Sequence, residues 1–139
     1  MNRICPVAIL LCTALCGCTF FQTEPTPPAE SVIVRQRMKE IQQTGMFICF
    51  CESERIPSAE ELRDVMTLAE KLGLMADLRT VPAIQIPALL RSGKGDLAIC
   101  TDNPATIHLD SVTYGTTSFA VRPDAHSWKS KIRQVAEAQ

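Results

Sequence analysis

Two apolar runs without polar interruption limit most strongly what this chain can fold into. Residues 46–51 read Met-Phe-Ile-Cys-Phe-Cys, and residues 97–100 read Leu-Ala-Ile-Cys. A strand with one face in water alternates apolar and polar residues, whereas a strand covered on both faces is apolar throughout. Both runs therefore predict strands inside a mostly parallel sheet that has helices on both faces.

Helical patterns lie between and around these runs. Apolar residues recur at steps of three and four over residues 31–43 and over residues 59–72, which predicts two amphipathic helices. Gly45 and Gly73 stand where these helices should end, because glycine readily takes the left-handed conformation that closes a helix. Ser58 and Glu61 also have the spacing of a capping box, which marks the start of the second helix.

The remaining elements complete an alternating order. Residues 74–81 predict a strand and residues 86–91 a short helix. Residues 111–121 hold a last strand, with Tyr114 and Gly115 before Thr117, and residues 126–138 predict a closing helix. Strands and helices that alternate in this way form a parallel sheet with right-handed crossovers. The predicted fold class is thus α/β: one small three-layer lobe over residues 32–139, with a mostly parallel sheet and helices on both faces.

The first residues predict an export signal. Arg3 is followed by an apolar stretch of signal-peptide length and then by Leu-Cys-Gly-Cys, which ends at Cys18. The spacing resembles a lipobox, the site at which bacterial lipoproteins are acylated and cleaved. Residues 1–17 are therefore predicted to be a lipoprotein signal peptide, and Cys18 to carry the lipid. The alternative is an ordinary signal peptide cut nearby.

A proline-rich segment follows the predicted lipid site. Residues 18–31 include Pro25, Pro27 and Pro28, which favour an extended and semi-rigid tether. We expect the lobe to be held at a membrane of the bacterial cell envelope, facing the periplasm. Thr19 after the lipid site favours the outer membrane over the inner one, by the rule that holds in enterobacteria-like systems.

Charge and motif content narrow the function. The formal net charge is −1, so the chain has no basic field that would attract nucleic acid. Ser53 and Ser111 lack the glycine frame of a nucleophile elbow, and His108 and His126 lack a motif partner. We therefore expect no catalytic residues and no enzyme activity.

Three of the seven cysteines fall within the predicted lobe, namely Cys49, Cys51 and Cys100. Their spacing matches no standard zinc site, so we expect no metal and no cofactor. A disulfide between Cys51 and Cys100 would form if the two strand ends are neighbours. The alternative is three buried thiols, which behave as small apolar side chains.

Short segments of the chain resemble a known family. Residues 89–98, Leu-Leu-Arg-Ser-Gly-Lys-Gly-Asp-Leu-Ala, resemble the "aLxsGkxDl" signature of bacterial extracellular solute-binding proteins of family 3. Residues 68–74, Leu-Ala-Glu-Lys-Leu-Gly-Leu, resemble that family's "lakxLGl" segment. The resemblance covers roughly residues 35–124. It implies the periplasmic type-2 binding fold, in which two lobes close around a small solute delivered to an ABC-type transporter.

The resemblance also implies where a solute would bind. In the family, the first half of the ligand site lies on loops that follow the strands of this lobe, as is general for open α/β sheets. Placed on this sequence, the candidate ligand-binding residues are Glu52 and Ser53 after the first strand and Thr101, Asp102 and Asn103 after the third.

Two departures from the family leave two hypotheses open. Amino-acid binders of the family carry Thr-x-x-Arg shortly after the third strand, and that arginine pairs with the ligand carboxylate. This chain has no arginine between Arg91 and Arg122, and the resemblance covers one lobe of the usual two. The first hypothesis is a lobe that binds a small polar solute, alone, as a dimer or with a second lobe. The second is a degenerate lobe that docks on an envelope protein.

Overall fold

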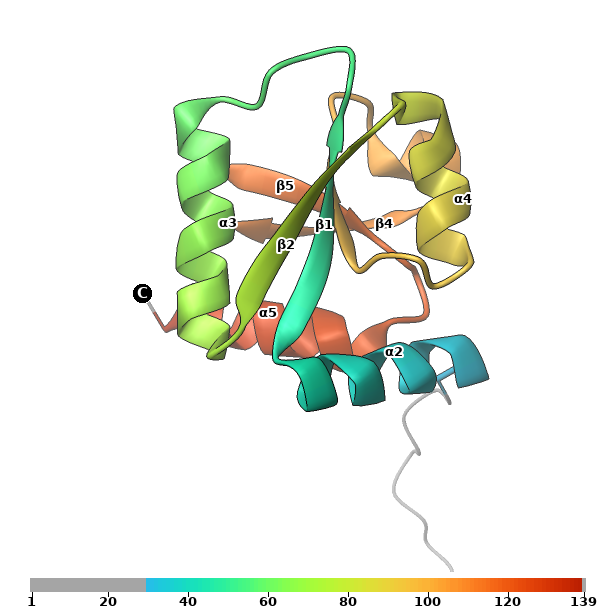
Figure 1. Cartoon of the computed structure of the whole chain (residues 1–139), viewed down its shortest axis with the longest axis vertical. Coiled ribbons are helices and arrows are strands. Elements are labelled where there is room, and N and C mark those ends of the chain that lie inside the picture. The colour runs from blue at the N-terminus through green and yellow to red at the C-terminus, as the bar shows by residue number, and fades with distance from the viewer. Residues whose placement is uncertain (1–29, 139) are drawn as a thin grey trace, which may run out of the picture.

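A five-stranded sheet lies at the centre of the molecule, with helices packed on both of its faces (Figure 1). The computed structural model describes residues 30–138. The strand order is β2-β1-β3-β5-β4, in which β1 pairs in parallel with β2 and β3, while β5 runs antiparallel to β3 and β4. The strands are β1 (Met46–Glu52), β2 (Met75–Val81), β3 (Leu97–Ile99), β4 (Asp110–Tyr114) and β5 (Thr117–Val121).

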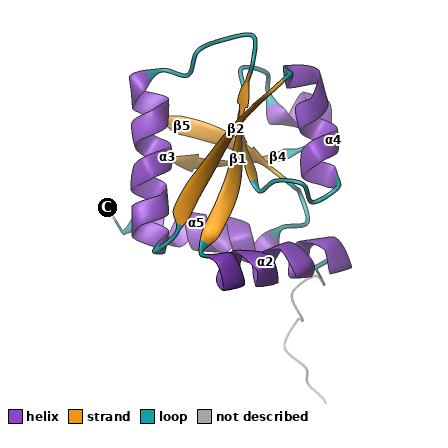
Figure 2. Cartoon of the chain, viewed as in Figure 1, coloured by secondary structure: helices purple, strands orange, loops and turns teal. Residues whose placement is uncertain are grey.

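The helices divide the core into two clusters, one on each face of the sheet. One cluster packs α3 and α5 against the sheet through residues such as Leu68 and Ile132, and the other packs α4 through Ile86 and Leu90. α2 lies across the end of the sheet at which the parallel strands begin (Figure 2). The helices are α2 (Val32–Thr44), α3 (Ala59–Leu72), α4 (Ile86–Arg91) and α5 (His126–Glu137), with short 3-10 turns η2 (Ala83–Gln85) and η3 (Pro104–Ile107).

The predicted α/β fold class is confirmed, and so are the predicted helix ends. Gly45 and Gly73 close α2 and α3 with φ of 71° and 70°. Ser58 and Glu61 form the complete capping box at the start of α3, with both side-chain-to-backbone hydrogen bonds present. Local side-chain chemistry thus sets where these two helices begin and end.

The last strand predicted within residues 111–121 is present as β5, but a second strand, β4, was not predicted, and the segment folds into the hairpin β4–β5. The chain turns at Gly115 and Thr116, and Gly115 has a φ of 63°. Glycine at the first central position of a two-residue hairpin loop allows this positive φ at no steric cost. β5 therefore enters the sheet between β3 and β4, antiparallel to both.

The three cysteines of the described lobe are free thiols in the structure. Cys49 and Cys51 belong to the cluster that packs against α3 and α5, whereas Cys100 packs with the cluster on the α4 face. Successive side chains of a strand point to opposite faces of its sheet, which accounts for this separation. The arrangement favours separate thiols over the Cys51–Cys100 disulfide.

The predicted lipid site at Cys18, the signal peptide and most of the predicted tether lie outside the described residues. Within residues 30–138, no helix combines the length and the apolar character that crossing a bilayer would require.

Candidate functional site

A cavity of about 320 Å³ lies beyond the carboxyl ends of β1 and β3. This edge of the sheet is where the sequence predicts a ligand site, because loops after parallel strands converge there. Two carboxylates, Glu52 and Asp102, contribute to its lining. The rest of the wall is mostly apolar and comes from η2, α4, η3 and the end of β3: Ala83, Ile84, Pro87, Ile107 and Cys100.

Glu52 is the best-positioned residue of the site. Its side chain is the last of β1 and is buried, with 6% of the residue exposed. Oε1 accepts a hydrogen bond of 2.6 Å from the backbone N–H of Thr101, and the Thr101 hydroxyl lies 3.2 and 3.1 Å from Oε1 and Oε2. These bonds join the loop after β3 to the end of β1. They fix one carboxylate at the cavity wall and orient the residues that follow Thr101.

Arg55 is a residue of this edge that sequence reasoning missed. Its guanidinium forms a two-pronged pair with Glu61, with N–O distances of 2.7 and 2.8 Å, and its Nε lies 3.8 Å from Oε2 of Glu52. Nε is enclosed and has no hydrogen-bond partner among the described residues. Arg55 thus places a positive charge next to Glu52, and the signal in the sequence was an arginine three residues after the acid that ends β1.

Arg55 also lowers the pKa of Glu61, its partner in this ion pair. The hydrogen bonds from Arg55 lower the pKa of Glu61 to about 2, opposed by burial and helped by the backbone at Ser58. The same contact raises the pKa of Arg55. Both groups are therefore charged at neutral pH, and the capping box of α3 is tied electrostatically to the loop that follows β1.

The other predicted site residues divide between the cavity and local structure. Asp102 lines the cavity and is exposed, so its carboxylate is accessible to a solute. Ser53 is exposed, and its backbone N–H donates to the carbonyl of Val81. Asn103 caps η3, where its Oδ1 accepts from the N–H of Ala105 at 3.1 Å. The structure thus brings together Glu52, Thr101 and Asp102. Ser53 and Asn103 form hydrogen bonds that stabilise the two loops.

Cys100 gives the cavity an unreactive thiol. Burial, followed by the nearby carboxylates of Glu52 and Asp102, raises the pKa of Cys100 to about 11. A thiol that stays protonated is a poor nucleophile and a poor metal ligand. In residues 30–138, no group of three or more His, Cys, Asp or Glu side chains could hold a metal ion.

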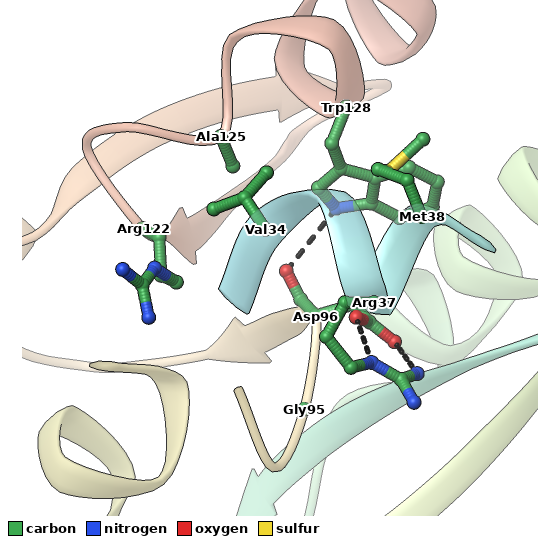
Figure 3. A pocket seen from close by; sticks show the side chains of 8 residues that line it. All are labelled: Val34, Arg37, Met38, Gly95, Asp96, Arg122, Ala125 and Trp128. Carbon is green, nitrogen blue, oxygen red and sulfur yellow. Dashed lines mark hydrogen bonds and ion pairs between the residues drawn. The ribbon is translucent and has the colours of Figure 1, made fainter. Parts of the chain in front are cut away.

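A second, much smaller cavity lies at the opposite end of the sheet, between α2 and α5 (Figure 3). It encloses about 20 Å³, which is room for about one water molecule. Arg37 donates to both oxygens of Asp96 at 3.0 and 2.7 Å, and the indole N–H of Trp128 donates to the Asp96 carbonyl at 3.1 Å. Asp96 Oδ2 also accepts from the N–H of Ile48. These contacts connect α2, α5 and β1 to the residue that precedes β3, and the cavity between them is too small for a solute.

No protein-family model matches this chain, and no curated protein matches it. Among solved structures, the chain is similar to the arginine-bound form of domain 1 from TmArgBP, with a TM-score of 0.57 and 14% sequence identity over 72% of this chain and 98% of that one. The chain has the fold of that domain.

A mutant of domain 1 from TmArgBP, also arginine-bound, gives the same result. Its TM-score is 0.58, again at 14% identity, and the match covers 73% of this chain and 96% of the mutant domain. The likeness extends over nearly all of a single separate domain. It therefore establishes that the described residues form a lobe of this architecture.

Proposed function

We propose that the chain is a solute-binding lobe of the bacterial cell envelope, anchored by a lipid at Cys18, which binds a small cationic solute. The observation that carries this proposal is the cavity beyond β1 and β3, in which Glu52 and Asp102 face an otherwise mostly apolar wall. The fold likeness to domain 1 from TmArgBP, a domain crystallised in an arginine-bound form, supports the proposal.

The charge of the lining selects the class of solute. The cavity wall contains two carboxylates, Glu52 and Asp102, and no lysine or arginine, so its charge is negative. A solute with an ammonium or guanidinium group would pair with Asp102, with Glu52 reinforcing the negative potential behind it. Its apolar part would lie against Ile84, Pro87 and Ile107. A solute that binds mainly through its own carboxylate would find no cationic partner here, since the Thr-x-x-Arg arginine of amino-acid binders is missing.

A second lobe or another subunit would be needed to enclose the bound solute. Tight small-molecule sites bury most of the ligand surface, and a single lobe covers one side only. A second lobe or another subunit placed over the mouth of the cavity would complete the site. The lobe alone is then expected to bind weakly and with preference for charge.

The test is a melting curve of the full chain in detergent micelles against a panel of amines, guanidines, amino acids and organic acids. A ligand at a hundred times its dissociation constant adds about 2.7 kcal/mol of stability, which is several degrees for a lobe of this size. We expect shifts with the cations only, and we expect Asp102→Asn to abolish them. Glu70→Gln, an exposed acid on α3, is the matched control and should retain them.

A second function has one observation in its favour. Ile56 and Ile84 are 92% and 88% exposed, and both follow strands at the edge that holds the cavity. Exposed isoleucines at one edge would suit a protein partner rather than a solute. This interaction module predicts that no solute moves the melting curve, and that Ile56→Ser with Ile84→Ser abolishes crosslinking to an envelope protein without loss of fold.

A further inference from the structure

The edge strand β2 has one free side among the described residues. Met75 N–H donates to the carbonyl of Gly45, and the carbonyl of Val81 accepts from Ser53, so alternate residues from Met75 to Val81 turn their backbone groups toward β1. In a parallel ladder, the residues between them turn theirs the other way. Ala76, Leu78 and Thr80 therefore present their N–H and C=O groups at the open edge of the sheet.

This edge lacks most of the features that normally prevent strand addition. Proteins protect an open edge with proline, with a bulge or with charges that point into the gap. β2 is seven residues long, pairs with β1 along its whole length without a bulge, and contains no proline. Leu78 is 38% exposed and Met75 is 68% exposed. Its charged residues are Asp77 and Arg79, which form an ion pair of 2.9 Å with each other on one face.

We propose that β2 is a self-association surface, which pairs antiparallel with β2 of a second copy of this chain about a two-fold axis at Leu78. In this register the outward backbone groups of Ala76 face those of Thr80 in the second copy, and Leu78 faces its own counterpart. Asp77 of each copy then lies opposite Arg79 of the other. The two Asp77–Arg79 pairs are non-hydrogen-bonded pairs of the ladder, in which side chains approach most closely.

Charge selects this register over its neighbours. An antiparallel pairing must place outward residues opposite outward residues, so the axis can move only from one residue of β2 to the next. Centring the axis on Asp77 places that carboxylate opposite itself, and centring it on Arg79 places two guanidinium groups together. Like charges directly opposite each other destabilise a sheet. Only the axis at Leu78 makes both residues complementary.

The surface beside β2 extends the match. A groove of about 460 Å³ runs between α3 and β2, and it includes Met66, which is 55% exposed. An antiparallel pair keeps equivalent faces of its two sheets on the same side, so the α3 helices of the two copies would flank the junction. Their methionines would then be covered, and methionine adapts well to such contacts. The proposed solute cavity has no lining residue from β2, so the two proposals are independent.

The test uses two oppositely tagged forms of the full chain in detergent micelles, and the readout is the dissociation constant for their association. The Asp77→Arg chain presents positive charge at both positions, and the Arg79→Asp chain presents negative charge at both. We expect each variant alone to associate at least about tenfold more weakly than the native chain, a change of about 1.4 kcal/mol. Mixing the two variants should restore association, and the double variant D77R/R79D should retain it.

Several outcomes would overturn the proposal. One is a native chain that stays monomeric at every concentration tested. Another is a dissociation constant that Asp77→Arg leaves unchanged, which is what shared occupancy of a micelle would give. A third is failure of the mixed variants to recover association while circular dichroism shows both to be folded. Lys131→Glu, an exposed charge reversal on α5, is the control and should not alter association.

Discussion

The buried carboxylate of Glu52 accepts a hydrogen bond of 2.6 Å from the backbone N–H of Thr101. This bond connects the end of β1 to the loop after β3, two segments that are far apart in the sequence and adjacent in the sheet. The Glu52 side chain therefore helps to fix the geometry of the candidate site. The same bond makes Glu52 part of both the stability of the lobe and the shape of its cavity.

Replacing Glu52 with alanine should destabilise the lobe by about 1–3 kcal/mol, because the N–H and the hydroxyl of Thr101 would lose the carboxylate that accepts their hydrogen bonds. Urea unfolding of the full chain, followed by circular dichroism, measures the change. Glu70→Ala removes an exposed acid and should change the free energy of unfolding little. Equal effects of the two substitutions would contradict the structural role of Glu52.

The ion pair between Arg37 and Asp96 should be the most costly polar contact to break. Asp96 is buried, with 8% of the residue exposed, and it holds Arg37 with both oxygens. Arg37→Ala leaves this carboxylate without its cation and should lower the free energy of unfolding by about 3 kcal/mol. Arg35→Ala, on the exposed side of the same helix, is the matched control. Similar losses for both variants would show that the pair contributes nothing specific.

Stability should fall in acid through two carboxyl groups. Arg55 lowers the pKa of Glu61 to about 2, and Arg122 lowers the pKa of Asp124 to about 2. In the unfolded chain the pKa of such groups is about 4. Their contribution is therefore fully present above that pH and is lost as the pH falls toward 2. Free energies of unfolding measured across this range should decline less steeply in Glu61→Gln than in the native chain. A slope unchanged by this substitution would count against the Arg55 contact.

The thiols should react slowly while the lobe is folded. Burial is the main reason that the pKa of Cys49 and of Cys51 is raised, and it raises that of Cys100 to about 11. At neutral pH, alkylation mapped by mass spectrometry should label all three fully only after unfolding. Cys100 lines the cavity, so a bound solute should slow its residual labelling further, without affecting Cys49. Rapid native labelling of Cys49 would contradict the packing of β1.

Much of this lobe follows from local sequence, because the signals that set its elements are local. The apolar runs of β1 and β3, the capping box at Ser58, and Gly45 and Gly73 all act within a few residues, so their pattern predicts structure directly. The edge that holds the candidate site was predicted from the carboxyl ends of the parallel strands together with the family resemblance, and Glu52 and Asp102, two of the five candidates, line the cavity there.

Other features depend on contacts that no local pattern records. Arg37 and Asp96 are 59 positions apart and meet only because α2 crosses the start of β3. The hairpin at Gly115 was missed because a single glycine within a strand pattern also fits a bulge, so it does not by itself mark a turn. Asn103 is a candidate ligand-binding residue, and its Oδ1 accepts a hydrogen bond from the N–H of Ala105 at the start of η3, a role that the sequence analysis did not predict. Sequence reasoning identifies candidate polar residues, but it does not show which of their side chains will form hydrogen bonds with nearby backbone groups.

The position of α2 would orient the lobe if the chain is anchored at Cys18 as proposed. α2 crosses the end of the sheet where β1 begins (Figure 1). The cavity lies at the other end of β1. In a chain anchored at Cys18, the attachment would enter through α2, and a pull on it would pass into the sheet through Arg37 and Asp96. The mouth of the cavity would then point away from the bilayer, on the side from which the proposed solute or second lobe would approach.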